Sequence, residues 1–247
     1  MIDYVGKVFT SNKHGDFMVT NYQNYDNVTV KFLNTGYVTT TQLYHIKDGS
    51  IKDRLSPSVY GVGIIGDAIA SLNGAKLKEY RVWRGLLGRC YNEKTKLRSI
   101  SYVDCSASDN FKYYPFFKDW CHDQIGFGEE GFELDKDILV KGNKTYSEDT
   151  CVFVPKEINL LFCKSNNIRG DYPIGVKFCN ISNKFKAAIT RNNKQFHLGT
   201  FCTTEEAFYA YKESKEAHIK DVANKWKDRI DPRVYEALIS WNVEITD

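Results

Sequence analysis

The last third of the chain constrains its fold most strongly, because three short strands there lead directly into one long helix. Alternating apolar residues predict strands over residues 174–182, 184–191 and 195–201. A helix follows over residues 203–228, opened by a capping box with Thr203 at the N-cap and Glu206 three residues later. A further helix should begin after Asp231, its cap, with Pro232 in the first position.

The two faces of this predicted sheet differ in character. The apolar residues that should pack on Ala207, Ala210 and Tyr211 of the long helix are Phe185, Ala187, Ile189, Phe196 and Leu198. The opposite face presents cationic and hydrogen-bonding side chains, namely Lys177, Lys184, Lys186, Thr190, Gln195 and His197. A three-stranded sheet with such an outer face can lie in the major groove of double-stranded DNA.

This C-terminal segment resembles the AP2 DNA-binding domain, in the form attached to phage and bacterial homing endonucleases. The matching residues are Gly175-Val176, "KFKAAI" (184–189) and "HLGTFCTTEEAFYAY" (197–211). The resemblance covers about residues 172–225 and implies a DNA-binding domain over residues 172–247. It also implies that the outer sheet residues choose the DNA site.

Two amphipathic helices are predicted in the middle of the chain, over residues 77–92 and 110–123. The apolar face of the first is formed by Tyr80, Trp83, Leu87 and Cys90. Aromatic residues recur at every third position of the second, at Phe111, Tyr114, Phe117 and Trp120. Three cations lie largely off the apolar face of the first helix and are expected to contact phosphate or solvent: Arg81, Arg84 and Arg89.

Charge is unevenly distributed around a predicted strand-turn-strand-helix segment at residues 134–162, whose turn is Gly142-Asn143. The segments 76–102 and 164–197 are rich in Lys and Arg, although the net charge of the chain is only +3. Five acids precede or occupy the first strand of the segment: Glu129, Glu130, Glu133, Asp135 and Asp137. This pattern suits a protein that holds a polyanion around a cation site. An exposed edge strand kept soluble by charge explains the acids equally well.

The middle of the chain resembles the HNH endonucleases that accompany such AP2 domains, which implies a ββα region over residues 77–165. The matching parts are "YRVWRGLLGRCYN" (80–92), "FKYYPFFKDW" (111–120) and "LDKDILVKGNKTYSEDTCVFVPKEIN" (134–159). By this resemblance Asp135 occupies the family's Asp position and Asn159 the position on the helix. Lys136 stands where the family has its catalytic histidine, and Thr150 where it has a bracing asparagine.

The implied chemistry is metal-dependent cleavage of DNA, in which a base activates water and a divalent cation stabilises the transition state. Asp135 and Asn159 are the expected ligands of Mg²⁺ or Mn²⁺. Asp137 should join them because alternate residues of a strand share a face. Lys136 is a poor base near neutral pH, since an ammonium beside carboxylates keeps its proton. Alternative sources of the base are His122, Asp137 or a metal-bound water, and Asn159 could instead brace the hairpin.

Short strands separated by Gly, Asn and Asp predict a small SH3-like or Tudor-like β-barrel over residues 1–60. The segment 37–46 is predicted as the last of these strands. Turns are expected at "HGDF" and "NTGY", and Pro and Gly mark a linker that ends the barrel and extends over residues 61–76. A protein partner is a further expectation for this barrel.

The bulk composition excludes several classes of protein. No apolar run reaches the roughly 18 residues of a membrane span, and the N-terminus lacks a signal-peptide profile. The seven cysteines form no CxxC pair, so no structural zinc is expected, and scattered thiols fit a reducing cytoplasm.

Together these patterns predict an α+β protein of 247 residues that binds DNA in a sequence-directed way and acts as a metal-dependent HNH-like endonuclease or nickase. The expected location is the cytoplasm of a bacterium infected by a phage. Two alternatives stay open. One is a catalytically degenerate DNA-binding, regulatory or anti-defence protein of a phage, and the other is a protein-interaction module.

Overall fold

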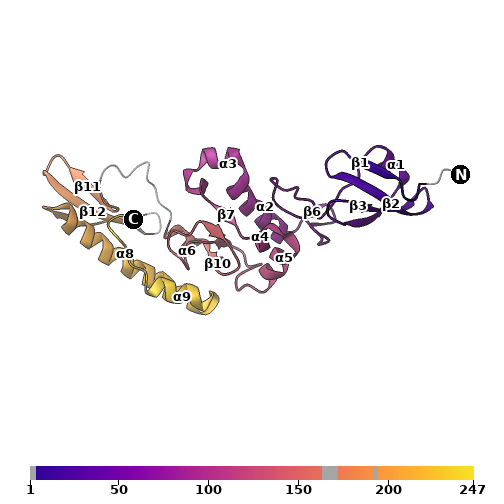
Figure 1. Cartoon of the computed structure of the whole chain (residues 1–247). Helices are drawn as coiled ribbons and strands as arrows, with labels where there is room; N and C mark the ends of the chain where they lie inside the picture. Colours follow the sequence, from indigo (N-terminus) through magenta and orange to yellow (C-terminus); the bar gives the residue numbers. More distant parts are fainter. Residues whose placement is uncertain (1–3, 163–171, 192–193) are drawn as a thin grey trace. The chain divides into compact units, whose positions relative to one another are not determined.

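The computed structural model describes residues 4–162, 172–191 and 194–247 of an α+β protein. Figure 1 shows the succession of helices and small sheets along the chain. The chain divides into two compact units, each described by itself below. The first comprises Met1–His122 with Lys144–Glu148, and the second comprises Asp123–Asn143 with Asp149–Asp247.

The first unit begins with an antiparallel sheet whose strand order follows the sequence. Its strands are β1 (Val8–Ser11), β2 (Gly15–Asn24), β3 (Asn27–Phe32) and β4 (Val38–Thr41). Alternate residues of β2 and β3 point into the core, where Phe17, Val19, Val28 and Val30 are fully buried. The expected N-terminal β module is therefore present as a four-stranded antiparallel sheet.

The predicted strand over residues 37–46 is half wrong, because β4 ends at Thr41 and a short helix follows, α1 (Leu43–Lys47). Leu43 and Ile46 lie one helical turn apart and are both buried in the core of the sheet. The helical spacing of these two apolar residues outweighs the β-branched residues before them.

The middle of the first unit contains short helices and two small strand pairs. Its elements are β5 (Ser71–Leu72), β6 (Ala75–Lys76), α2 (Lys78–Tyr91), α3 (Glu93–Arg98), η1 (Ile100–Tyr102), β7 (Ser106–Ala107), α4 (Asp109–Lys112), α5 (Tyr114–His122) and β9 (Thr145–Tyr146). β5 pairs with β6, and β7 pairs with β9 in parallel. The predicted apolar face of α2 is confirmed, because Tyr80, Trp83, Leu87 and Cys90 are buried.

The single helix predicted over residues 110–123 is broken at Tyr113, where the chain is extended. Pro115 has no N–H with which to bond the carbonyl of Phe111 four residues earlier. The indole Nε1 of Trp83 donates to that carbonyl instead, at 2.8 Å. Tyr114 N–H donates to the carbonyl of Ile64 at 2.9 Å, so contacts with distant segments replace the missing helical bonds.

The second unit joins a small strand pair and a short helix to the C-terminal sheet and its helices. Its elements are β8 (Phe132–Asp135), β10 (Val152–Pro155), α6 (Lys156–Leu160), β11 (Val176–Cys179), β12 (Lys184–Arg191), β13 (Lys194–Phe201), α8 (Thr204–Trp226), η2 (Lys227–Arg229) and α9 (Pro232–Ile239). The ring of Phe132 on β8 meets that of Trp226 on α8 edge to face. Glu157 on α6 accepts from Lys225 and Trp226, so α6 is also tied to the end of α8.

The strand expected from residue 134 to the Gly142-Asn143 turn is shorter than predicted. β8 ends at Asp135, which lies opposite Val152 of the antiparallel partner β10. The carboxylate of Asp135 accepts the N–H groups of Asp137 and Ile138, at 2.7 and 2.8 Å, and this turns the chain out of the strand.

The C-terminal sheet has the order β11-β12-β13, is antiparallel, and packs on α8 (Figure 1). Ala187 and Ile189 of β12 are buried, together with Ala207 and Tyr211 of α8, as predicted. Phe196 pairs with Ile189 but stays 49% exposed. The predicted caps of both helices are also confirmed: the capping box joins Thr203 and Glu206, and Asp231 caps α9 with Pro232 following.

Two absences hold for the described part of the chain. None of its helices is long and apolar enough to cross a membrane. None of the six cysteines within the described residues is joined to another of them by a disulfide.

Gly175 supplies a test of how the sheet meets α8. Its φ is +79°, and a Cβ added there would lie 2.0 Å from Cδ2 of the buried Tyr211 ring. Gly142 has the same φ, but a Cβ there would meet no atom within 4 Å. Both Ala variants should lose about 1–2 kcal/mol from backbone strain. Gly175→Ala should lose about 1–3 kcal/mol more through the clash. Urea unfolding measures this difference, and equal losses would contradict the close packing.

Candidate nucleic-acid interface

The outer face of the C-terminal sheet is defined by its strand register, because residues directly opposite each other point the same way. Lys177 lies opposite Lys186, and Thr190 lies opposite Gln195. The six residues predicted for this face, Lys177, Lys184, Lys186, Thr190, Gln195 and His197, are all exposed. The structure therefore gathers them on one face, away from α8.

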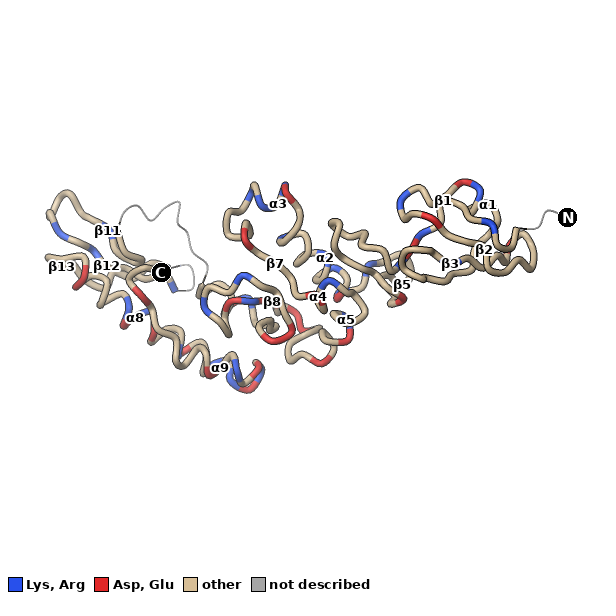
Figure 2. The backbone as a smooth tube through the Cα atoms, viewed as in Figure 1, with Lys and Arg blue, Asp and Glu red and all other residues tan. Residues whose placement is uncertain are grey.

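Two lysines occupy directly opposed positions at the centre of this face. Lys177 and Lys186 are cross-strand neighbours, an arrangement that is destabilising for like charges. No Asp or Glu lies within β11, β12 or β13. Figure 2 shows Lys and Arg of this part of the chain in blue. Among the described residues, no carboxylate forms an ion pair with either lysine. The free protein thus keeps a concentrated positive charge on an exposed surface.

A β-bulge in β13 adds a residue to this face that the strand alternation did not predict. The register shifts between Ala187 and Ala188, which leaves Leu198 without a direct partner. Alternation resumes one residue later, so Thr200 lies opposite Lys186 and is exposed on the outer face. Gly199 is the only sequence signal of this bulge, since Gly inside a strand often marks one.

Cys179 also lies on this face, opposite Lys184 at the end of β11. Hydrogen bonds from Ser182, with a further contribution from Lys186, lower the pKa of the Cys179 thiol to about 6. The sequence offered no signal for this, because the effect depends on the turn after β11.

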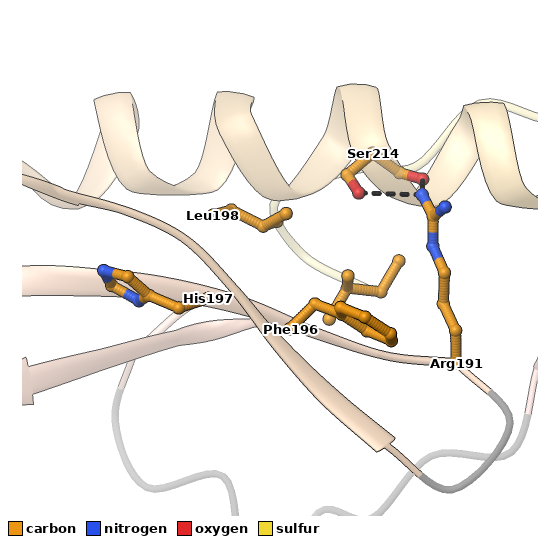
Figure 3. Close-up of a pocket in the computed structure, with 6 residues that line it drawn as sticks. Arg191, Phe196, His197, Leu198 and Ser214 are labelled. Carbon is orange, nitrogen blue, oxygen red and sulfur yellow. Dashed lines mark hydrogen bonds between the residues drawn. The ribbon is translucent and has the colours of Figure 1, made fainter.

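Arg191 anchors the opposite side of the sheet to α8, as Figure 3 shows. Its Nη2 donates to the carbonyl and the hydroxyl of Ser214, at 2.7 and 2.9 Å. Leu198 lies between β13 and the helix, beside a cavity of about 320 Å³. These contacts tie the end of β12 to α8 on the side of the sheet opposite the lysines.

At the strand-strand-helix segment, the predicted catalytic residues have structural partners. Lys136 is 7% exposed, and its ammonium lies 2.5 Å from Asp137 Oδ1 and 2.8 Å from the carbonyl of Asn143. Asn143 in turn donates to the carbonyl of Lys136. Lys136 therefore closes the loop after β8. Because β8 ends at Asp135, the strand alternation used to place Asp137 does not extend to that residue.

Asp135 is partly buried and accepts two backbone N–H groups, as described above. Burial raises its pKa, although the bonds from Ile138 and Asp137 oppose that shift. Its carboxylate oxygens are of the type that Mg²⁺ prefers. The buried ammonium of Lys136 nearby opposes a second cation, so the observed contacts favour a turn-forming role.

Asn159, on α6, donates to Glu133 Oε2 at 2.9 Å. Glu133 and Asp135 alternate with the buried Phe132 and Leu134, so the two acids share one side of β8. The sequence placed Glu133 among the five acids but did not predict its bond to Asn159. Over the described ranges, no three His, Cys, Asp or Glu side chains gather as a metal-binding group.

The remaining predicted residues lie in the first unit. His122 ends α5, and its Nε2 is 3.6 Å from the buried carboxylate of Glu79. Arg81 and Arg84 are exposed on α2, as phosphate contact would require. Arg89 is only partly exposed, because its guanidinium packs on the rings of Tyr102 and Tyr146.

Comparison of the chain with protein-family models, with curated proteins and with solved structures found no match.

Two substitutions separate the role of Asp135 as a hydrogen-bond acceptor in the turn from its role as a partly buried ionisable group. Asp135→Ala leaves the N–H groups of Asp137 and Ile138 without their acceptor, which should cost about 1–3 kcal/mol. Asp135→Asn keeps an acceptor oxygen and should cost much less. Since the pKa of Asp135 is raised in the folded state, wild-type stability should fall as pH rises from the ordinary Asp value of 3.8 through the raised pKa.

Chemical denaturation at several pH values measures both effects. The Asn variant should lose this part of the pH dependence, because it has no carboxyl group to ionise. An Ala variant as stable as the Asn variant would show that the turn does not depend on this acceptor.

Proposed function

We propose that this protein binds double-stranded DNA through the outer face of its C-terminal sheet, and that the face reads base sequence. The observation that carries the proposal is the directly opposed pair Lys177 and Lys186 on a sheet that has no acidic residue. A polyanion is the partner whose binding relieves this repulsion. The resemblance of this segment to the AP2 DNA-binding domain, expected from the sequence, is part of the same proposal.

The chemistry of the face supports a role in the major groove. Lysine donates to the O6 and N7 atoms of guanine, and glutamine can bond adenine through N6 and N7. Gln195 and Thr190 lie opposite each other, and His197 is held near Thr200, with 3.3 Å between Nε2 and Oγ1. The outer-face lysines of β11 and β12 lie toward one end of the sheet, and Thr190 and Gln195 lie toward the other. Phosphate contacts by lysines would position the sheet while the neutral side chains contact bases.

Reversing one central charge tests this proposal. Lys186→Glu should weaken binding of a duplex by more than about tenfold, because an acid replaces a cation next to phosphate. The matched control is Lys220→Glu, which makes the same change at an exposed position on α8. Fluorescence anisotropy with a labelled duplex gives both affinities, and thermal melting shows that both variants fold. Equal losses in the two variants would remove the sheet from the interface.

Cleavage of DNA is the second candidate function. The observation that favours it is the order β8, β10, α6, with Asn159 of the helix bonded to an acid on the first strand. In this hypothesis Asp135, Asp137 and Asn159 hold Mg²⁺ or Mn²⁺, and the cation supplies charge that stabilises the transition state. Lys136 orders the loop beside them.

A supercoiled plasmid tests cleavage directly. Wild-type protein, Asp135→Asn and Asn159→Ala are compared with Mg²⁺ or Mn²⁺ and with a chelator. Asp135→Asn is the informative variant, because it keeps the turn acceptor and removes the charged ligand. Chelator-sensitive nicking that both variants lose would support the endonuclease. A plasmid that is shifted on the gel and never nicked would support a non-cleaving regulatory or anti-defence protein.

The N-terminal sheet belongs to neither proposal. Closure of that sheet into an SH3-like or Tudor-like barrel, and its binding of a protein partner, stay predictions.

A further inference from the structure

The first unit contains a cationic pocket, and none of the residues that line it belongs to the C-terminal sheet. Its volume is about 310 Å³, and it is lined by Tyr60, Lys76, Tyr80, Arg81, Arg84 and Gly85. All of these lie in the first unit, on α2, on β6 or in the turn at residue 60. Three of the six carry a positive charge, and none carries a negative one.

The three cations of the pocket have no acidic partner in the part of the chain that the structure describes. Within the described residues, no carboxylate forms an ion pair with Lys76, Arg81 or Arg84. Lys76 lies 5.0 Å from the centre of the Tyr80 ring, and the Arg84 guanidinium lies 6.0 Å from that of Tyr60. Aromatic contacts hold these cations in place while leaving their hydrogen-bond donors available.

Gly85 keeps the pocket open. It is an exposed residue in the interior of α2, where glycine is less favourable than any residue except proline. A Cβ at this position would meet no atom within 4 Å, so internal packing does not require glycine there. The lack of a side chain has one structural effect, which is to leave the space between the cations free.

The turn that places Tyr60 is strained. Tyr60 has φ +52° and is followed by Gly61 at +77°, a pair of left-handed residues that usually has Asn in the first position. On α2, Gly88 allows the ring to approach, since a Cβ there would lie 3.1 Å from the Tyr60 hydroxyl oxygen. Backbone strain of this kind is concentrated at ligand-binding positions. It holds the ring where it forms one wall of the pocket.

We infer that this pocket binds the phosphate group of a nucleotide, either free or within a nucleic-acid strand. Two guanidinium groups and one ammonium can donate to several phosphate oxygens at once. The tyrosine rings offer surfaces for the attached sugar or base. The inference goes beyond the proposed function, because the pocket and the C-terminal sheet have no residue in common.

The experiment uses the full chain carrying Lys186→Glu, so that the sheet does not contribute. A fluorescein-labelled oligothymidylate is the probe, and inorganic phosphate and thymidine monophosphate are the competitors. Gly85→Leu fills the pocket without changing its charge, and Arg84→Gln removes one cation. The matched control is Arg98→Gln, which removes an exposed cation of α3 outside the pocket.

Gly85→Leu and Arg84→Gln should each weaken binding about tenfold, whereas Arg98→Gln should change the affinity less than about twofold. The Tm of the Gly85→Leu variant should stay equal or rise, because Leu favours a helix more than Gly does. If that variant does not fold, Arg84→Gln carries the test. Competition by both small molecules identifies a free-phosphate site, and competition by neither identifies a site for the nucleic-acid backbone.

Two results would overturn the inference. One is the absence of saturable oligonucleotide binding in the Lys186→Glu chain. The other is an equal affinity of the Gly85→Leu and Arg98→Gln variants. Duplex binding by Gly85→Leu with the sheet intact is measured separately, so failure of the pocket and failure of the sheet give different results.

Discussion

One constraint organises the C-terminal third of the protein: a three-stranded sheet with a single helix beside it can bury only one of its faces. α8 covers the apolar side, where Ala187 and Ile189 meet Ala207 and Tyr211. The other face must be polar, but nothing in folding requires it to be cationic or free of acids. That composition is a cost to the free protein, and the DNA binding proposed above would offset it.

The strand-strand-helix segment is governed by a different requirement, the pairing of buried polar groups. A buried ammonium at Lys136 needs oxygen partners, and Asp137 and the Asn143 carbonyl supply them. The carboxylate of Asp135 satisfies two backbone N–H groups that would otherwise have no partner in the turn. These contacts explain Lys136 by the stability of the loop, whatever the function of the segment.

Features that depend on neighbouring residues were predicted from the sequence, and features that depend on distant ones were not. The capping box at Thr203 is local, and the exposed side of the C-terminal sheet follows from strand alternation. The helix break before Pro115 involves Trp83, 28 residues from the carbonyl that it bonds. The bulge at Leu198 and the bond between Glu133 and Asn159 likewise depend on how separate segments meet, which residue spacing does not reveal.

The opposed lysines have a consequence for how the protein responds to its ionic surroundings. Salt screens the repulsion between Lys177 and Lys186 and should therefore stabilise the unbound sheet. The same salt competes with the protein for phosphate and weakens any complex with DNA. Under the proposed function, ionic strength would thus act with opposite sign on this local repulsion and on the complex: added salt would relieve the strain between the two lysines of the free sheet and weaken the contacts with phosphate.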